Sequence, residues 1–324
     1  MCSLSYPGEA TILNAMLYFV VVLVWGSTWI AIAHQVGDVS NAASICYRSA
    51  AAGVLLFAYL IVRRARLRFT ARQHVLMAII GITMFSCNYL FLYAAEQRIP
   101  SGLVAVLFAM TLPLNVINSW LFLHRPIPWQ VLVATTVGIA GIAVMFWDDV
   151  SGAHFDGTTL LGVALALGGA TCFSCGNIVS AFSQSEHLPV VQAEAYGLVY
   201  GALVLIPVTL ATGGFGFSTT GGYLWSLGYL ILFGSILGFG FYLTILGRIG
   251  AERAGYITVL FPVVALLWST LFERYVWTVH AVVGALIVLA GSALAVTPRR
   301  RLSRAAAEGE VVDERRQAAP ARRQ

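Results

Sequence analysis

The sequence contains no lysine, and charged side chains of all kinds make up only 10% of its 324 residues. Soluble domains carry about 25% charged residues, so the composition excludes a soluble fold of this length. Hydrophobic residues make up 59% of the chain. They form blocks of about 20 residues, the length that crosses a bilayer core of about 30 Å. The composition therefore predicts a polytopic helical membrane protein.

Motifs for catalysis and energy conversion are also missing. The sequence has no Walker A motif, no HExxH and no GxSxG, which argues against an ATP motor, a zinc protease or a serine hydrolase. Cys172 and Cys175 form a C-x-x-C pair in an apolar segment without a second pair or a nearby histidine, so we expect no metal or redox site. We predict no enzyme activity, no cofactor and no nucleic-acid partner.

Ten apolar segments are long enough to be transmembrane helices. They cover residues 12–33, 43–62, 74–95, 102–123, 129–147, 160–182, 192–212, 223–246, 254–272 and 277–296. Short connections join several of them, for example residues 96–101, and these cannot hold a soluble domain. The fold class that we predict is an all-α membrane protein with ten transmembrane helices.

The arginines predict the orientation of these segments. Residues 63–72, which follow the second segment, carry five of the 19 arginines, whereas the opposite side collects Asp38, Asp148, Asp149 and Asp156. Positively charged loops stay in the cytoplasm. With ten spans, both termini are then cytoplasmic. We therefore expect a multi-pass protein of the bacterial inner membrane, with the lipid bilayer and a small-molecule substrate as its partners. The sequence does not determine the oligomeric state, and a monomer is one of the alternatives.

The chain contains an internal repeat. Pro113 and Pro262 occupy equivalent positions at an offset of 149 residues, and Trp25-Gly26 matches Cys175-Gly176 at an offset of 150. Each repeat holds five spans, and because five is odd the second copy enters the membrane from the opposite side. Inverted repeats of this kind are typical of transporters.

This repeat predicts the organisation of the chain. The segments are an N-terminal segment (1–11), a first five-helix repeat (12–147), an outer connecting loop (148–159), a second repeat (160–298) and a disordered cytoplasmic tail (299–324).

Several stretches resemble one transporter family. They are WGSTWIAI at 25–32, Arg48, LYAAEQRIPSGLVAVLFAMTLPL from Leu92, YLTILGRI at 242–249 and VLFPVVALLWSTLFERYVW at 259–277. Over about residues 10–298 the chain resembles the EamA family of the drug/metabolite transporter superfamily. The resemblance implies two inverted five-helix repeats and a carrier of small metabolites, often an exporter, without fixing the substrate. The family pattern P-x(10)-E is kept at Pro262 and Glu273, whereas His124 replaces the glutamate of the first repeat.

The two matched prolines, Pro113 and Pro262, are candidates for a hinge. A proline inside a helix frees the carbonyl four residues earlier and kinks the helix. The kinks are either static and shape the cavity or act as paired hinges in alternating access, and the sequence leaves both open.

Polar and aromatic residues within the spans are candidates for a substrate cavity. They are Trp25, Trp29, Arg48, Asn88, Tyr89, Asn115, Asn118, Ser174, Asn177 and Tyr256. An ionisable group inside a membrane suggests function, and Arg48 could attract a substrate carboxylate or phosphate. The alternatives are hydrogen bonds between helices for the asparagines, core packing for the aromatic residues and snorkelling for Arg48.

The function that we predict is transport of small metabolites by alternating access, as an exporter of amino acids or related compounds, aromatic ones among them. A carrier of nucleotide sugars or other phosphorylated metabolites is the alternative, followed by a channel or a non-transporting membrane protein. The acidic residues Glu96, Glu194 and Glu273 lie at span ends, where we expect them to anchor the helices at the interface. Without a carboxylate at a span centre, facilitated diffusion or exchange is favoured over proton antiport.

Overall fold

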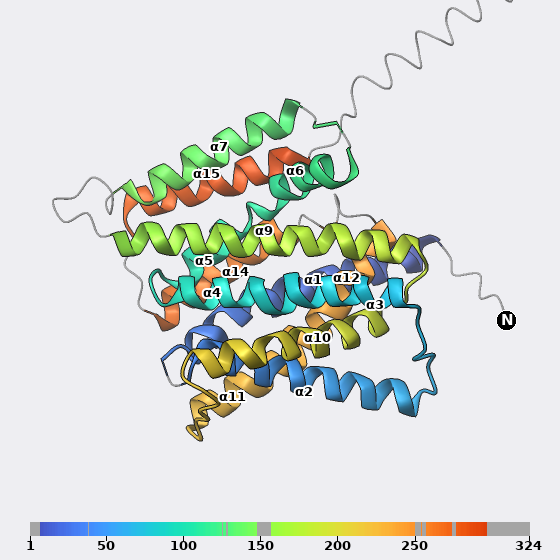
Figure 1. Ribbon diagram of the computed structural model, residues 1–324. Helices are drawn as coiled ribbons and strands as arrows, with labels where there is room; N and C mark the ends of the chain where they lie inside the picture. The colour runs from blue at the N-terminus through green and yellow to red at the C-terminus, as the bar shows by residue number, and fades with distance from the viewer. Residues whose placement is uncertain are drawn as a thin grey trace, which may run out of the picture.

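The computed structural model describes residues 7–37, 39–124, 126–127, 129–147, 157–249, 254, 257–273 and 277–296. Within these ranges the chain is helical apart from its connections and one isolated bridge between Val36 and Val39. The helices form one bundle with their axes roughly parallel (Figure 1). The predicted tail, residues 299–324, lies outside the described residues.

The ten predicted spans are confirmed, and three of them are divided by a change of helix type or by a break. In order, they are α1 (Pro7–Ala33), α2 (Asn41–Val62), α3, η1 and α4 (Ala71–Ile80, Gly81–Cys87 and Asn88–Glu96), α5 and α6 (Ser101–Phe108 and Thr111–Leu123), α7 (Trp129–Met145), α9 (Gly157–Ser185), α10 (Val190–Ala211), α11, η2 and α12 (Gly221–Tyr229, Leu230–Gly238 and Phe239–Ile249), α14 (Ile257–Phe272) and α15 (Val279–Val296). By length and composition, seven of these ten can cross a membrane, and α7, α14 and α15 are shorter apolar helices.

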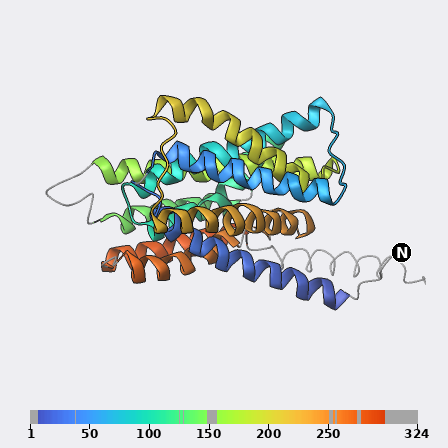
Figure 2. The same cartoon turned by 90° about the horizontal axis from the view of Figure 1, so that it is seen from below.

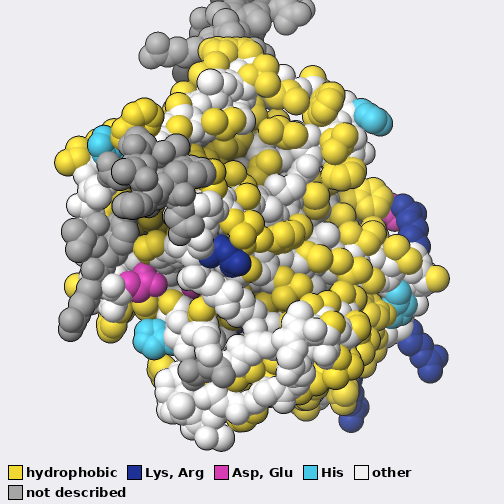
Figure 3. All heavy atoms as spheres, turned by 60° about the vertical axis from the view of Figure 1, so that its left-hand side comes forward, with side chains coloured by type: hydrophobic (Ala, Val, Ile, Leu, Met, Phe, Trp, Pro, Cys, Tyr) yellow, Lys and Arg dark blue, Asp and Glu magenta, His cyan; other side chains and the backbone are white. Residues whose placement is uncertain are grey.

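The surface of the bundle suits a lipid environment. Large hydrophobic side chains such as Val62, Trp225 and Leu271 are more than two-thirds exposed, at 80%, 76% and 72%. In Figure 3 hydrophobic side chains cover most of the visible face, and charged ones are few. Exposed apolar area of this extent is found where a protein meets a membrane or a partner. The chain is therefore a multi-pass membrane protein.

The packing of the spans agrees with two inverted repeats. The second spans of the two halves, α2 and α10, pack on each other, and so do the fifth spans, α7 and α15. The first span of each half packs on the fourth span of the other half. Thus α1 packs on α14, and α9, the counterpart of α1, packs on α5 and α6. Figure 1 shows α7 and α15 as one pair on one side of the bundle, away from α2 and α10, and Figure 2 shows α2 and α10 next to each other. A pseudo-twofold axis between the halves produces these reciprocal contacts.

Both halves contain a π-helical segment in the third span. The segment η1 covers Gly81–Cys87 and η2 covers Leu230–Gly238, and Ser86 and Ser235 within them are 149 residues apart. Insertions of π-helix are frequent at functional sites. In the first half, η1 packs closely on α10, since a Cβ on Gly81 would lie 2.3 Å from the carbonyl oxygen of Gly197. In the second half, the side chain of Arg48 fills the matching space between α2 and η2.

The two prolines have different local structures. The fourth span is broken at Ala109 and Met110, so that Pro113 lies in the first turn of α6. Pro113 has no backbone N–H to donate to the carbonyl of Ala109. That carbonyl instead accepts a hydrogen bond from the backbone N–H of Leu112 at 3.2 Å. Pro262 instead lies inside the continuous helix α14. The local hydrogen bond shows how the first kink is satisfied, and the hinge role of both prolines stays a prediction.

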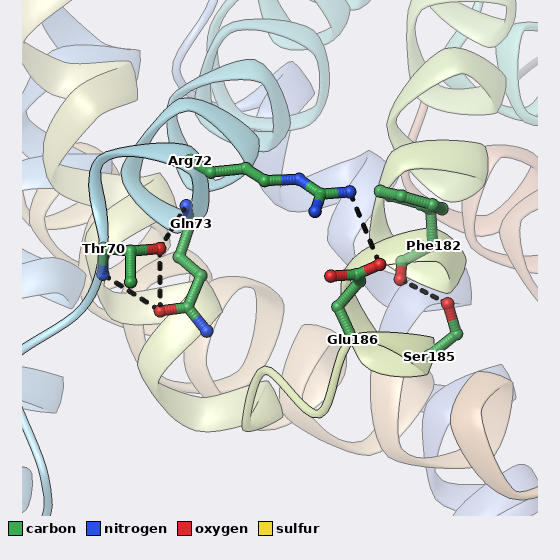
Figure 4. A network of polar contacts seen from close by, with 6 residues as sticks. All are labelled: Thr70, Arg72, Gln73, Phe182, Ser185 and Glu186. Atoms are coloured by element: carbon green, nitrogen blue, oxygen red, sulfur yellow. Dashed lines mark hydrogen bonds and ion pairs between the residues drawn. The ribbon is translucent and has the colours of Figure 1, made fainter.

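The ion pair that is found among the described residues lies at one end of the bundle. Arg72 at the start of α3 lies 3.4 Å from Glu186 beyond α9, and Thr70 with Gln73 forms a capping box that starts α3 (Figure 4). Both side chains of the ion pair are exposed, so the pair adds little to stability. It does place the start of the third span and the end of the sixth at the same end. Glu96, which ends the third span, therefore marks the opposite end.

Candidate substrate-binding site

A small cavity lies between the two halves of the bundle. Its volume is about 40 Å³, enough for a few water molecules. The lining residues come from both repeats and are Trp25, Thr28, Trp29, Ile32, Arg48, Asn88, Tyr89, Leu92, Phe108, Phe173, Phe239 and Phe261. A metabolite of several heavy atoms can enter only when the spans around the cavity separate.

Aromatic rings form most of the cavity wall. The Trp25 ring lies 5.0 Å from Phe239 and 4.7 Å from Tyr242, and the Trp29 ring is stacked on Phe261 at 5.8 Å. Rings at these separations attract one another by about 0.5–1.5 kcal/mol beyond their burial. Such a wall suits an apolar or aromatic group of a ligand, and it also offers π-faces to a cation.

Arg48 brings a positive charge to this apolar wall. Its side chain is 2% exposed, its Nε donates to Ser235 Oγ at 2.7 Å, and one Nη donates to the Tyr89 hydroxyl at 2.8 Å. The guanidinium carbon lies 4.1 Å from the centroid of the Tyr89 ring. Among the described residues no carboxylate pairs with Arg48. The neutral hydroxyls hold the guanidinium in place but leave its charge uncompensated.

Two hydrogen-bonding atoms of opposite kind lack partners in this cavity. They are the second terminal nitrogen of Arg48, Nη1, which is a donor, and Oδ1 of Asn88, which is an acceptor. Asn88 is 1% exposed, and its Nδ2 donates to the carbonyl of Met84 at 3.2 Å, which fixes the amide orientation. Buried polar atoms are normally paired. A charged donor and a neutral acceptor lining one cavity can receive a ligand with a carboxylate and an ammonium group.

The structure separates the predicted cavity residues into two groups. Trp25, Trp29, Arg48, Asn88 and Tyr89 line the cavity together. The others that the structure describes, Asn115, Asn118, Ser174 and Asn177, form hydrogen bonds between α6 and α9. Tyr256 lies outside the described residues.

The second group is an asparagine cluster of these four residues. Asn118 Nδ2 donates to Ser174 Oγ at 2.9 Å, and Asn177 Nδ2 donates to Asn115 Oδ1 at 3.3 Å. The Tyr242 hydroxyl donates to Asn177 Oδ1 at 3.1 Å, and the ring of Tyr242 packs on Trp25. The cluster therefore reaches the cavity wall through one tyrosine. Its role in substrate binding stays a prediction.

Sequence reasoning did not single out Phe108, Phe173, Phe239 and Phe261 as cavity residues. A phenylalanine in a span faces lipid as readily as a cavity, so its identity carries no signal. A weak signal existed in Gly234 and Gly238, which are four residues apart in η2. A Cβ at these positions would lie 2.9 Å from Arg48 Nη2 and 2.5 Å from Trp25 Nε1. The glycines make room for the two side chains that define the site.

The fold and the cavity together define a class of protein. Ten spans in two inverted halves, with a binding cavity between the halves, are the architecture of a membrane transporter for small metabolites. The chain belongs to the EamA-like transporter family, whose sequence profile matches residues 12–147 and 160–297. These two matches correspond to the two halves of the bundle.

Several similar proteins are named as transporters or exporters. The uncharacterized inner membrane transporter YedA of Escherichia coli (strain K12) is 30% identical over 259 residues, covering 78% of this chain and 80% of YedA. A probable amino-acid metabolite efflux pump of the same strain is 26% identical over 294 residues, covering 86% of this chain and 93% of the pump. The threonine/homoserine exporter RhtA of that strain is 32% identical over 143 residues, 44% of each chain.

One solved crystal structure has the same fold. It superposes on this chain with a TM-score of 0.62 at 17% sequence identity, and the match covers 87% of this chain and 96% of that one. At this level of identity the likeness concerns the arrangement of the helices and not the ligand.

Proposed function

We propose that the protein exports amino acids across the bacterial inner membrane, and that the cavity binds the amino acid as a zwitterion. The carboxylate accepts from the unpaired nitrogen of Arg48, the ammonium donates to Oδ1 of Asn88, and the side chain packs on the ring wall. The observation that carries the proposal is the pair of unpartnered atoms, one charged donor and one acceptor, in a single aromatic cavity.

Two of the similar proteins support this ligand class. One is named a probable amino-acid metabolite efflux pump and the other a threonine/homoserine exporter. The aromatic wall favours amino acids with a large apolar or aromatic side chain. Nucleotide sugars fit less well, since a diphosphate carries two negative charges and Arg48 is the one cationic residue among those that line the cavity.

The mechanism that fits this site is alternating access. The cavity lies at the contact between the halves. Its lining residues come from α1, α2, α4 and α5 of one half and from α9, α12 and α14 of the other. Rocking of one half against the other opens the cavity to one side at a time. With both termini in the cytoplasm, the end marked by Arg72 and Glu186 is the entry side and the Glu96 end is the exit side.

The experiment is binding and counterflow of phenylalanine with purified protein in liposomes. We expect saturable binding and counterflow for the wild type. Replacing Arg48→Met removes hydrogen bonds to a charged group, worth about 1.5–3 kcal/mol, and should weaken Kd by about 10- to 100-fold. Asn88→Leu should weaken it by a smaller factor.

The matched control is Arg72→Met, which removes an exposed arginine outside the cavity and should leave Kd unchanged. Nucleotide sugars serve as competing ligands. If UDP-glucose displaced phenylalanine, or if Arg48→Met and Asn88→Leu both bound phenylalanine as the wild type does, the proposed site would be wrong.

A further inference from the structure

Unpartnered polar atoms gather in one region of the described structure. Among all the described residues, nine buried side-chain nitrogen or oxygen atoms lack a hydrogen-bond partner. Six of these nine atoms lie in this region and belong to Gln35, Arg48, Asn88, Glu96 and Ser101. Leaving such an atom unpaired is destabilising, and each one calls for an explanation. Six in one region indicate that the region pairs with a polar ligand or with water in another state of the protein.

Three side chains on one face of α4 link these atoms from the cavity to the end of the helix. Tyr89, Tyr93 and Glu96 are four and three residues apart, which places them on the same face. Tyr89 accepts from Arg48 at the cavity, and the Tyr93 hydroxyl donates to Gln35 Oε1 at 2.7 Å one turn further on. Glu96 lies seven residues after Tyr89, a distance of about 10 Å along the helix at 1.5 Å per residue. We refer to this line as the α4 polar face.

Two carboxyl groups lie at the far end of the α4 polar face. Both oxygens of Glu96 are buried without a partner. Glu273 at the end of α14 accepts the backbone N–H of Ser101 at 3.4 Å and the hydroxyl of Ser269. Ser101 is 1% exposed, and its own hydroxyl is unpartnered. Among the described residues the ion pair is Arg72–Glu186 at the other end of the bundle, so neither carboxylate has a cationic partner there.

We propose that the α4 polar face is the closed exit passage of the cavity, and that Glu96 and Glu273 form a second site that binds the ammonium group of the departing amino acid. Opposite charges then occupy the two ends of the passage. Arg48 binds the carboxylate while the amino acid is in the cavity, and the two glutamates receive the ammonium after the amino acid has left Arg48 and Asn88. Tyr93 and Gln35 offer hydrogen bonds midway. The ligand class rests on the proposed function, whereas the passage itself does not.

A purely structural role explains Glu273 but not Glu96. A carboxylate next to the first N–H groups of a helix is stabilising, and Glu273 caps α5 at Ser101 in this way. Glu96 makes no such bond, since both of its oxygens lack partners. Burying a carboxylate without pairing it is unfavourable, so a functional reason is needed for its position. The sequence had placed Glu96 at the interface as an anchor.

The passage can be tested on the wild-type protein without a known substrate. A water-soluble carbodiimide with an added amine modifies carboxyl groups that water reaches, and peptide mass spectrometry in nanodiscs locates them. Glu186, which is exposed, is the positive control. Glu194, which is 1% exposed, packs against Gly240 of α12 and has one unpartnered oxygen, is the negative control. We expect Glu96 to be modified about tenfold more than Glu194, since only opening of the passage wets it.

Modification of Glu186 alone, with Glu96 as inert as Glu194, would overturn the passage. This outcome does not depend on which metabolite is carried. It is therefore distinguishable from a failure of the proposed function, which would appear as the absence of phenylalanine binding and counterflow in the wild type.

The ammonium site is tested by Glu96→Gln, which keeps the shape and removes the charge. We expect phenylalanine counterflow to fall about tenfold, the loss of one charged hydrogen bond, while equilibrium binding at the cavity and the melting temperature stay at wild-type values. Glu186→Gln is the matched control and should transport normally. Wild-type counterflow by Glu96→Gln, or a loss explained by a lower melting temperature, would reject the second site.

Discussion

Arg48 is the residue on which the site depends, and its geometry requires arginine. The guanidinium uses one nitrogen for Ser235 and a second for Tyr89, and a third remains for a ligand. Lysine carries the same charge on a single nitrogen without the planar fork. We expect Arg48→Lys to weaken phenylalanine binding by about tenfold, the equivalent of about 1.4 kcal/mol. Isothermal titration of the two proteins measures this, and equal affinities would show that charge alone is used.

Asn118 provides a second test at the residue scale. Its Nδ2 donates to Ser174 between α6 and α9 and does not line the cavity. Hydrogen bonds between spans contribute only about 0.6 kcal/mol on average. We therefore expect Asn118→Ala to lower stability by about that amount, measured as a small drop in melting temperature, with unchanged phenylalanine affinity. A large change in affinity with unchanged stability would place Asn118 in the substrate path after all.

Side-chain chemistry predicted part of the site and missed the rest for a physical reason. Arg48 and Asn88 stand out in an apolar span because a polar group there needs a partner. Phe108 and Phe261 do not stand out, since lipid and cavity are equally suitable surroundings for a phenylalanine. Glu194 was expected at the interface, four residues into α10, yet it is 1% exposed. Burial near a span end depends on how neighbouring helices pack, which periodicity does not reveal.

At the scale of the helical element, the close contact between η1 and α10 is a constraint that can be measured. A Cβ on Gly81 would lie 2.3 Å from the carbonyl oxygen of Gly197, a backbone atom that cannot move aside. Overpacking of this kind costs about 1–3 kcal/mol. We expect Gly81→Ala to lower the melting temperature clearly. Gly228→Ala in α11 meets no atom within 4 Å and should be neutral, so equal effects would contradict the packing that the structure shows.

The proline inside α14 allows the hinge and the static kink to be separated. Pro262→Ala restores a backbone N–H and favours a straight helix. If the helix bends during transport, counterflow should slow by about tenfold, or about 1.4 kcal/mol, while phenylalanine affinity and melting temperature change little. Pro207→Ala is the control, because it removes a proline from α10, whereas the matching helix α2 contains no proline. A parallel loss of affinity in Pro262→Ala would indicate a static kink that shapes the cavity.

The elements themselves could largely be predicted from the sequence, but their internal breaks could not. Apolar blocks of about 20 residues identify spans because the bilayer sets their length. The π-segments η1 and η2 and the break at Ala109–Met110 leave no such mark, since they redistribute hydrogen bonds without changing hydrophobicity. Gly81 and Gly234 show where close approaches occur, but their partners appear only in the packed structure.

At the scale of the whole molecule, the inverted repeat suits the alternating access that we propose, which needs two states of similar energy. The two halves contact each other through equivalent helices, α2 with α10 and α7 with α15. If the halves exchange conformations, the cavity therefore opens to the opposite side of the membrane. In this structure the cavity between the halves has a volume of only about 40 Å³. Arg48 breaks the symmetry. The segment η1 packs on Gly197 of α10, whereas η2 packs on the charged side chain of Arg48 in α2.

This asymmetry gives the orientation in the membrane a mechanistic meaning, and the orientation can be tested directly. Residues 63–70 and the Arg72–Glu186 pair lie at one end, and residues 212–220 follow α10 at the other. Since positively charged loops stay inside, a membrane-impermeant maleimide added to intact cells should label Thr219→Cys and not Arg68→Cys. Both positions should react after the membrane is opened, which controls for their accessibility. The reverse pattern on intact cells would turn the α4 polar face toward the cytoplasm, and the passage at Glu96 would then serve entry of the substrate and not its exit.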